Sequence, residues 1–204
     1  MAAELETLGT RVLPIQLDAS DAGEVGAMVR TTLKTFGVIH GLINCAGIFD
    51  ATPIADLTVE QWDRMLAVNL RSVFVCSQAV LPTMKEWNHG RIVSISSLAA
   101  QVGGVFAGAH YSAAKAGILS FTRSLARQVA GCGINVNAIC PGPTLTPMAD
   151  QWPPGASAQT LANVPLGRFG QPEDIANVAL FLASEVAGYI HGAHVDVNGG
   201  LYMD

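Results

Sequence analysis

The sequence predicts an α/β fold in which helices cover the faces of a mainly parallel sheet. Short apolar runs that suit buried strands alternate with longer segments that suit helices, and this order is typical of βαβ units. The chain has 204 residues, of which 50% are hydrophobic, so it is long and apolar enough to bury a substantial core. We therefore expect a single domain over residues 1–204.

Start and stop signals place the helices along the chain. Ser20 and Asp21 can cap a helix that Gly37 ends, and Thr58 with Gln61 fits a capping box. The expected helices cover 1–8, 22–36, 59–87, 111–130 and 172–184, and the expected strands cover 11–17, 38–44, 90–96, 135–140 and 192–197. The proline-rich stretch 143–168 is expected to be irregular.

Three residues weaken individual assignments. Pro14 lies within the first expected strand, although it has no N–H group to donate to a ladder. Asn69 and Pro82 are expected to interrupt the long helix 59–87.

Charge and cysteine content limit the partners of the chain. Only 13% of the residues are charged, against about 25% in a typical soluble domain, and this low share predicts buried surface in a homo-oligomer, a dimer or a tetramer. The net charge of −5 offers no basic footprint for nucleic acid. Four cysteines without C-x-x-C or zinc-like spacing indicate reduced thiols.

The sequence also bears on location and metals. The N-terminus has no signal-peptide pattern, and no apolar run is expected to span a bilayer. We therefore expect a cytoplasmic protein with no membrane partner. His191 and His194 lie three residues apart, but no third ligand is in view, so no metal site is expected.

Short motifs follow the carboxyl ends of four expected strands. They are Asp18, the segment 44–47, Ser97 and the segment 141–146. Ligands of parallel α/β sheets bind outside the carboxyl ends of the strands, because these ends meet at one edge. The sequence therefore predicts an active site at this edge.

Tyr111 and Lys115 lie four residues apart at the start of an expected helix, so they share one face. A tyrosine hydroxyl has a pKa near ~10, and moving it to about 7 needs roughly 4 kcal/mol. One ammonium group ~4–6 Å away supplies about 3–4 kcal/mol at an effective dielectric constant near 20. Lys115 could therefore make Tyr111 an acid or base at neutral pH, with Ser97 holding a substrate oxygen. The alternative is an ordinary amphipathic helix that carries both residues by chance.

The ordered set of motifs resembles the short-chain dehydrogenase/reductase family, and the resemblance covers essentially the whole chain. The residues that carry it are Asp18 in LDASD, Asn44-Cys45-Ala46-Gly47, Asn69 in VNL, Ser97 in ISS, Tyr111 to Lys115, Pro141-Gly142 with Thr146, and the C-terminal PLGRFGQPEDIANVALFLAS and VNGG. The resemblance implies a Rossmann-like fold and a nicotinamide cofactor, NAD or NADP, with the choice between them left open.

The same resemblance implies a catalytic set of four residues. Tyr111 would be the general acid in carbonyl reduction and the general base in alcohol oxidation. Lys115 would lower the pKa of Tyr111 and bind the hydroxyls of the nicotinamide ribose. Ser97 would donate to the substrate oxygen, and Asn69 would hold a water of the proton relay. Asn69 could instead merely cap or bend a helix.

The resemblance further implies a set of cofactor-binding residues in addition to Tyr111 and Lys115. Asp18 would accept from the adenine amino group, and Asn44 with Gly47 would line the adenosine side. The nicotinamide amide would be surrounded by Pro141, Gly142, Thr144 and Thr146. Gly47 could instead merely turn the chain.

Three departures separate this chain from the family pattern. Ser97 precedes Tyr111 by 14 positions, one more than is usual, and we attribute this to an insertion in the loop 103–108. Cys45 replaces the second Asn of Asn-Asn-Ala-Gly. The glycine-rich phosphate loop of the family and its first two strands are absent, which predicts an N-terminally truncated fold with weak dinucleotide binding.

The missing strands leave three structural possibilities for the expected strands 11–17 and 38–44. The two can pair directly, another chain can fill the gap between them, or the gene product can be longer. We favour the last possibility over a naturally truncated protein.

Three functions remain open at this point. The first is an NAD(P)-dependent oxidoreductase that acts on a secondary alcohol or carbonyl. The second is a catalytically silent relative that serves as an oligomeric binding or scaffold protein. The third and weakest is a nucleotide-sugar epimerase.

The expected substrate loops, 99–109 and 143–167, are apolar, which favours a largely uncharged carbonyl compound as substrate. The expected helices 59–87 and 111–130 resemble those that form four-helix dimer interfaces in the family.

Overall fold

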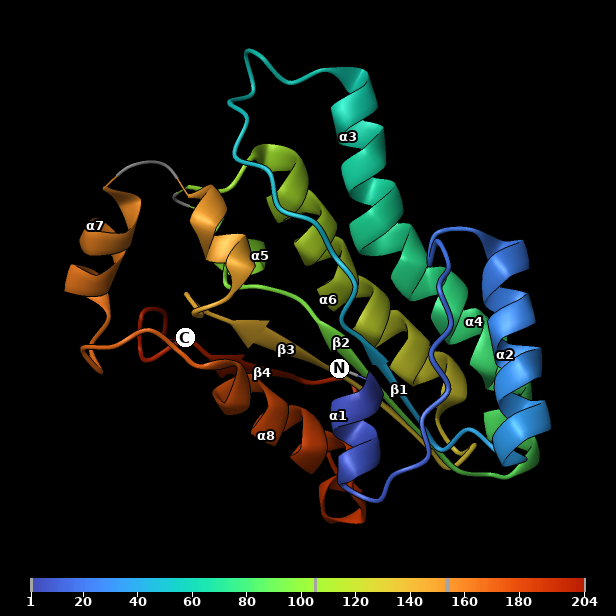
Figure 1. Cartoon of the computed structure of the whole chain (residues 1–204). Coiled ribbons are helices and arrows are strands. Elements are labelled where there is room, and N and C mark those ends of the chain that lie inside the picture. Colours follow the sequence, from blue (N-terminus) through green and yellow to red (C-terminus); the bar gives the residue numbers. More distant parts are fainter. Residues whose placement is uncertain (1, 105, 153–154, 204) are drawn as a thin grey trace.

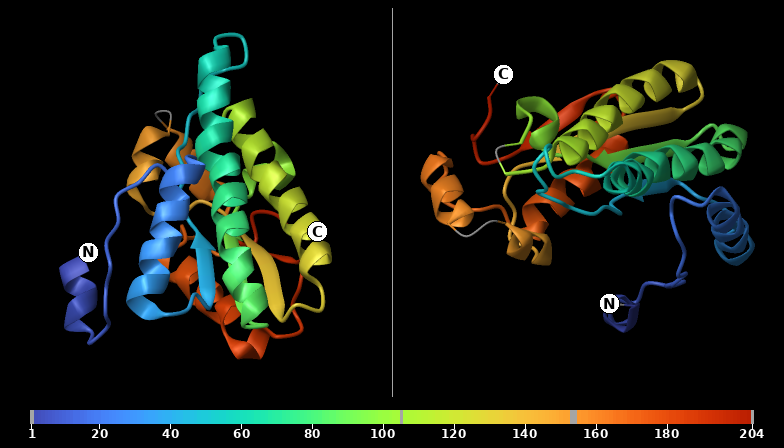
Figure 2. Two further views of the ribbon diagram at one scale, coloured as in Figure 1. Left: turned by 90° about the vertical axis from the view of Figure 1, so that its right-hand side faces the viewer. Right: turned by 90° about the horizontal axis from the view of Figure 1, so that it is seen from above.

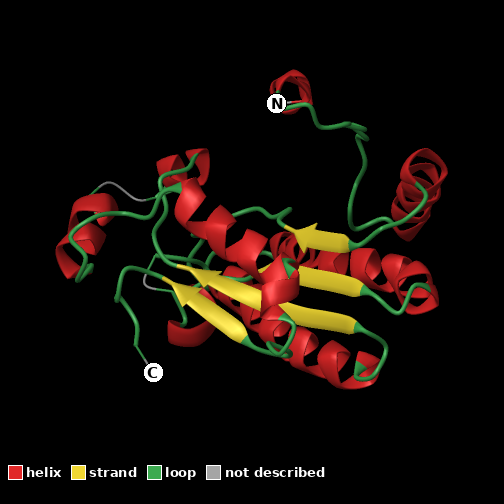
Figure 3. Cartoon of the chain, turned by 90° about the horizontal axis from the view of Figure 1, so that it is seen from below, coloured by secondary structure: helices red, strands yellow, loops and turns green. Residues whose placement is uncertain are grey.

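The computed structural model describes residues 2–104, 106–152 and 155–203. Within them, four parallel strands form one sheet in the order β1-β2-β3-β4 (Figures 1 and 3). The strands are β1 (Gly41–Asn44), β2 (Gly90–Ile95), β3 (Ile134–Pro141) and β4 (His194–Val197). The predicted α/β fold with a parallel sheet is confirmed.

The strand register brings the carboxyl ends together. Asn44 pairs with Ser94, Ser94 with Ala138, and Ala138 with His194. Each strand therefore ends within a few residues of its neighbour, and the segments that follow them leave from the same edge of the sheet.

Helices cover both faces of this sheet. The helices are α1 (Ala2–Thr7), α2 (Ala22–Phe36), α3 (Val59–Leu66), α4 (Ser72–Glu86), α5 (Ala99–Val102), α6 (Ala109–Val129), α7 (Ala156–Asn163) and α8 (Pro172–Ala183). Helices α4 and α6 pack on one face and α8 packs on the other. The alternation of strand side chains produces this division, because Ile92 packs against α4 and α6 while its neighbour Val93 packs against α8.

A π-helical segment, η1 (Ala67–Arg71), joins α3 to α4 without a break in the helix. The interruption expected at Asn69 is therefore present, as one wide turn. The expected interruption at Pro82 is wrong, because Pro82 lies inside α4. Burial of its neighbours Val80 and Met84 in the core holds the helix together despite one lost backbone hydrogen bond. The Thr58 capping box forms as predicted.

The continuous helix Val59–Glu86 corrects the expectation about apolar runs. Among the described residues it is long and apolar enough to cross a membrane by length and composition alone. Core helices of globular proteins pass the same test, and 44% of the apolar window of this one is buried inside the protein. Length and composition are therefore weak evidence for a membrane span here.

The expected strand 11–17 is wrong, and so is its proposed direct pairing with 38–44. These residues form no ladder, and within the described part of the chain β1 pairs only with β2. The segment instead runs beside α2, where Arg11 donates to the carbonyl oxygen of Thr35 and Leu17 packs near Val25. A strand needs a paired neighbour as well as an apolar sequence. Figure 2 shows α1 and the chain that follows it standing apart from the sheet.

Two short helices escaped prediction. Helix α5 has 4 residues and follows Ser97, and α7 has 8 residues within the stretch expected to be irregular. The stretch also holds a 3-10 turn at Pro147–Gln151. Such short helices carry too few turns for an apolar periodicity to show.

We predict that Met84→Ala lowers the free energy of unfolding by about 2–5 kcal/mol, since it empties a fully buried site in the core. Met84 is 0% exposed, whereas Met203 is 79% exposed. Met203→Ala is therefore the matched control and should leave the stability nearly unchanged. Urea denaturation of both variants measures the difference, and equal losses would contradict this description of the core.

Candidate active site

A cavity of about 990 Å³ opens at the carboxyl edge of the sheet. Its lining contains eight of the residues predicted from the sequence, namely Gly47, Ser97, Tyr111, Lys115, Pro141, Gly142, Thr144 and Thr146. Asp18, Asn44 and Asn69 are not among the lining residues. Most of the remaining wall is apolar, with contributions from Phe49, Phe106, Met148 and Trp152.

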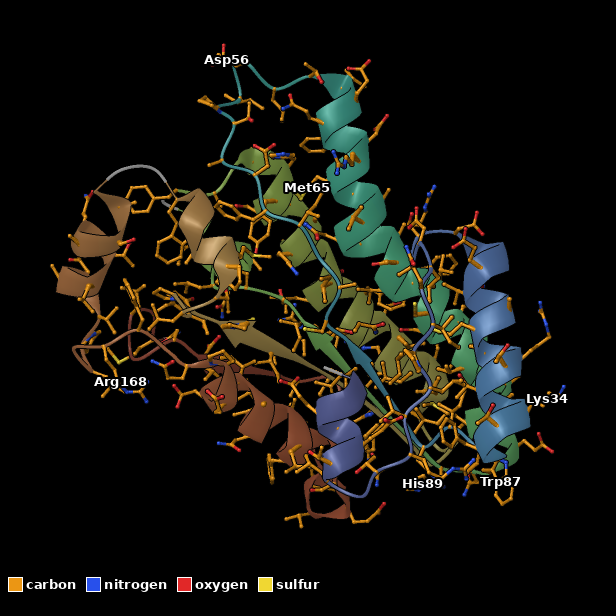
Figure 4. All side chains as sticks on the ribbon, in the orientation of Figure 1. Lys34, Asp56, Met65, Trp87, His89 and Arg168 are labelled. Atoms are coloured by element: carbon orange, nitrogen blue, oxygen red, sulfur yellow. The ribbon has the colours of Figure 1, made fainter. Side chains whose placement is uncertain are left out.

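Tyr111 and Lys115 lie in the first turns of α6, which begins at Ala109. Both are buried, and the Lys115 Nζ atom lies 5.7 Å from the centre of the Tyr111 ring. The predicted shared face is therefore present. Tyr111 also packs against Met65 of α3, which Figure 4 shows where α3 lies beside α6.

The Lys115 ammonium group is held by the backbone of β2. Its Nζ donates to the carbonyl oxygen of Ile95 at 2.9 Å. Burial disfavours the charged form and lowers the pKa of Lys115 from 10.5 to about 8, although the nearby Cys45 and Cys140 oppose the shift. Lys115 therefore changes charge close to physiological pH.

The pKa of Tyr111 moves in the direction opposite to the one expected from Lys115 alone. Burial raises the pKa of Tyr111, and a hydrogen bond with the side chain of Ser97 only partly offsets this effect. The sequence-based estimate counted the neighbouring charge but not the desolvation of the phenol. The Tyr111 hydroxyl is therefore protonated at pH 7 in this structure.

Ser97 stands where β2 ends, within reach of Tyr111. Its Oγ accepts from the backbone N–H of Ala99 at 3.1 Å and shares a hydrogen bond with Tyr111. The neighbouring Ser96 is engaged elsewhere, because its Oγ donates to the carbonyl oxygen of Lys115 at 2.8 Å. The geometry therefore favours Ser97 over Ser96 as the residue beside the phenol.

Asn69 and Gly47 form a contact behind Lys115. The Asn69 side chain pairs with both backbone groups of Ile48, each at 2.8 Å. A Cβ atom on Gly47 would lie 2.8 Å from Asn69 Oδ1 and 3.5 Å from Lys115 Nζ. Gly47 does not have a positive φ, so the close approach, and not a turn, requires glycine here. Whether Asn69 also holds a water stays a prediction.

The other two residues outside the cavity lining hold local structure. Asn44 Nδ2 donates to Ser94 Oγ at 3.1 Å and to Ser77 Oγ at 3.4 Å, which ties β1 to β2 and α4. Asp18 accepts from the N–H and the hydroxyl of Ser20, both at 2.8 Å, and these bonds lower its pKa. Their adenosine contacts therefore stay predictions.

The loop after β3 is pinned against the end of β4. Gly142 N–H donates to the carbonyl oxygen of Val197 at 2.9 Å, and a Cβ on Gly142 would lie 2.7 Å from the Cα of Asn198. Thr144 Oγ1 donates to the carbonyl oxygen of Gly142 at 3.0 Å. These hydrogen bonds hold Gly142 and Thr144 in place, and both residues line the same cavity as Lys115.

Sequence reasoning missed the aromatic part of the wall. The rings of Phe49 and Tyr111 meet edge to face with their centres 5.2 Å apart, and Trp152 meets Phe169 in the same way at 5.9 Å. These aromatic residues lie in loops, where no periodic pattern marks them as lining a site. Of these rings, Phe49 contributes to the burial of the Tyr111 phenol.

Comparison with known proteins shows which protein family this chain resembles. It matches the sequence model of a family described as enoyl-(acyl carrier protein) reductase over residues 1–202. It is 40% identical over 200 residues to the 3-oxoacyl-[acyl-carrier-protein] reductase FabG of Staphylococcus aureus, covering 98% of this chain and 81% of that protein. FabG of Thermotoga maritima is 37% identical over 203 residues, with 100% and 82% covered.

Solved structures agree with these sequence matches. A crystal structure of 3-oxoacyl-[acyl-carrier protein] reductase from Brucella melitensis has a TM-score of 0.93 and 36% identity, covering 100% of this chain and 77% of that one. A second structure from that organism, with bound NAD, has a TM-score of 0.91 and 35% identity over 100% of this chain and 76% of that one. The chain therefore belongs to the short-chain dehydrogenase/reductases, as predicted, a family of oxidoreductases whose cofactor is NAD or NADP.

The cavity fits the nicotinamide half of such a cofactor. Lys115, Thr144 and Thr146 all line the cavity, so an ammonium group and two hydroxyl side chains belong to its wall. The sequence contains no G-x-G-x-x-G loop, so no pyrophosphate contact is assigned to a residue of this chain.

We predict a pH dependence of stability that arises from Lys115. In the unfolded chain its pKa is 10.5 and in the folded protein about 8. Unfolding therefore takes up a proton between these values, so stability rises with pH through this window. Relative to Lys115→Met, the free energy of unfolding of the wild type should rise by up to ~3 kcal/mol from pH 8 to 10.5.

Denaturant unfolding at several pH values measures this difference. The matched control is Lys34→Met, which removes an exposed lysine on the outer face of α2 (Figure 4). If the difference in free energy of unfolding between the wild type and Lys115→Met does not change with pH, the ammonium group is not desolvated.

Proposed function

We propose that this chain, as a single domain, is an NAD(P)-dependent reductase that converts the keto group of a 3-oxoacyl thioester into a secondary alcohol. The observation that carries the proposal is the Ser97–Tyr111 hydrogen bond beside the buried Lys115, inside a large cavity with an apolar wall. Relatives named 3-oxoacyl reductases at 36–40% identity support the substrate class. An acyl chain suits a wall of this kind, because its burial needs no polar partner.

The protonation states favour the direction of reduction. The raised pKa of Tyr111 keeps its hydroxyl protonated at pH 7, so it can donate to the carbonyl oxygen as negative charge develops there. Ser97 holds the same oxygen and fixes its distance from the phenol. The nicotinamide cofactor, when bound, supplies the hydride that the carbonyl carbon accepts.

Lys115 serves both the proton donor and the cofactor in this proposal. Its ammonium group stabilises the tyrosinate that forms after proton transfer and contacts the nicotinamide ribose. Pro141, Gly142, Thr144 and Thr146 hold the nicotinamide amide. Asn69 orders a water behind Lys115, and Asp18, Asn44 and Gly47 face the adenosine side.

The competing proposal is a catalytically silent scaffold protein. One observation favours it: the sequence lacks the glycine-rich loop that binds the pyrophosphate in this family. Dinucleotide binding separates the two functions, since a scaffold needs no cofactor.

Assembly and location complete the proposal. We propose a cytoplasmic homo-oligomer, a dimer or tetramer, that associates through the face where α3 and α4 lie beside α6. A shallow depression there is lined by Leu66, Leu70 and Phe121 beside Phe74, which is 44% exposed. Apolar side chains of this size at a surface are typical of interfaces.

The function is tested by titrating the purified chain with NADH and NADPH while following nicotinamide fluorescence, and then adding a short 3-oxoacyl thioester. We expect micromolar binding and turnover. Tyr111→Phe should keep the binding but lose at least about 100-fold in turnover, the usual contribution of a proton donor.

Phe49→Leu is the control variant, since it changes a neighbouring ring without removing a proton donor. No binding by the folded chain up to millimolar cofactor would rule out the reductase and leave the scaffold. Undiminished turnover by Tyr111→Phe would refute the role of the phenol.

The oligomer is tested by sedimentation velocity. Phe74→Glu should shift the wild-type assembly toward smaller species, because it places a charge in the proposed interface. Phe36→Glu changes a similarly exposed phenylalanine on α2 and should leave the assembly intact. A monomeric wild type, or an assembly that Phe74→Glu does not change, would contradict this interface.

A further inference from the structure

A second group of chemically capable side chains lies between β3, β4 and α5, outside the cavity lining. Cys140 pairs with Asp196 in the parallel register, and His194 lies two residues before Asp196. Residues two apart on a strand point to the same face. The ligand atoms of Cys140, His194 and Asp196 accordingly lie within 4.8 Å of one another.

Gln101 reaches this group from α5. Its Nε2 lies 3.1 Å from His194 Nε2 and 3.3 Å from Asp196 Oδ2. One amide N–H₂ group thus stands between a carboxylate oxygen, which accepts, and an imidazole nitrogen whose role depends on the tautomer of His194. The other ring nitrogen, Nδ1, lies 3.5 Å from the Arg123 guanidinium. The Asp196 carboxylate favours a positively charged group among these atoms.

Two oxygens of the group are buried without a partner. They are Gln101 Oε1 and Asp196 Oδ1, and neither has a hydrogen bond in the structure. A buried unpaired acceptor costs about 1–3 kcal/mol. The two oxygens can therefore coordinate a cation, which would replace the interaction of the Cys140 thiol with the Asp196 carboxylate.

The residue types match one class of cation. Thiolate, imidazole and carboxylate are the ligands that Zn²⁺ prefers, at bond lengths of about 2.0–2.3 Å in a tetrahedron. Such ligand atoms lie roughly 3.3–3.8 Å apart, so the observed spacing needs to close by about 1 Å. A half-turn of the Gln101 amide brings Oε1 to the side of His194 and Asp196, which supplies a fourth ligand.

We propose that Cys140, His194 and Asp196 bind a divalent transition-metal ion of the zinc type, with the Gln101 carboxamide oxygen as the fourth ligand. Four protein ligands leave no open position, so the ion is structural. It joins the edge strand β4 to α5, the helix that follows Ser97. The proposal does not depend on the cofactor or on the reductase activity.

The test is a titration of the metal-free chain with Co²⁺, followed by ultraviolet and visible absorption. We expect one equivalent to bind with an intense near-ultraviolet thiolate-to-cobalt band and the visible bands of a tetrahedral ion, and Zn²⁺ should displace it. Cys140→Ser should abolish the thiolate band, whereas Cys132→Ser and Cys45→Ser, the matched controls, should keep it.

The other ligands are tested by affinity. His194→Ala and Asp196→Asn should each weaken Co²⁺ binding more than about tenfold, and Gln101→Glu should tighten it, since it supplies an anionic oxygen. Zn²⁺ should raise the Tm of the wild type but not that of Cys140→Ser. X-ray absorption of the zinc-loaded wild type should show one sulfur and otherwise nitrogen or oxygen ligands, which tests the site even if a variant fails to fold.

Three outcomes would overturn the site. They are the absence of a thiolate band in the wild type, a band that persists in folded Cys140→Ser, and a zinc ion without a sulfur ligand.

Discussion

Two reciprocal hydrogen bonds between α6 and the end of β2 set the geometry on which the candidate site depends. Lys115 Nζ donates to the carbonyl oxygen of Ile95, and Ser96 Oγ donates to the carbonyl oxygen of Lys115. The helix that carries Tyr111 is thereby fixed to the strand that ends before Ser97. A shift of either element would move the phenol relative to the serine, so the two bonds decide whether these side chains can act on one oxygen atom.

The same contact explains the electrostatics of the site. An ammonium group that exchanges water for a single backbone oxygen becomes easier to deprotonate, while the phenol packed under Phe49 becomes harder to ionise. The two shifts move the proton affinities of Tyr111 and Lys115 apart, so that the phenol holds its proton more tightly than the ammonium group does. In the proposed reduction, a proton would therefore pass downhill from the Lys115 ammonium group to a Tyr111 tyrosinate.

The parts of the fold and site that could be predicted rest on local patterns. Helical periodicity fixes Tyr111 and Lys115 on one face, and strand ends in a parallel sheet locate Ser97, without knowledge of any distant residue. The features that the sequence did not predict depend on contacts between residues far apart in the chain. Residues 11–17 have the composition of a strand but no paired neighbour, and the group around Cys140 is assembled by the register of β3 with β4. The direction of the Tyr111 shift depends on burial, which a single sequence does not reveal.

The π-helical segment around Asn69 can be understood as an α-helix that holds one extra residue. Each residue of an α-helix turns the chain by about 100°. The wide turn absorbs the rotation of this extra residue, so loss of a single residue between 67 and 71 would restore a regular helix without rotating α3 against α4. The wide turn that carries Asn69 would close, and the pairing of Asn69 with the backbone of Ile48 would be lost. The site thus depends on the exact number of residues in this turn. Insertions and deletions here should therefore be rarer than substitutions.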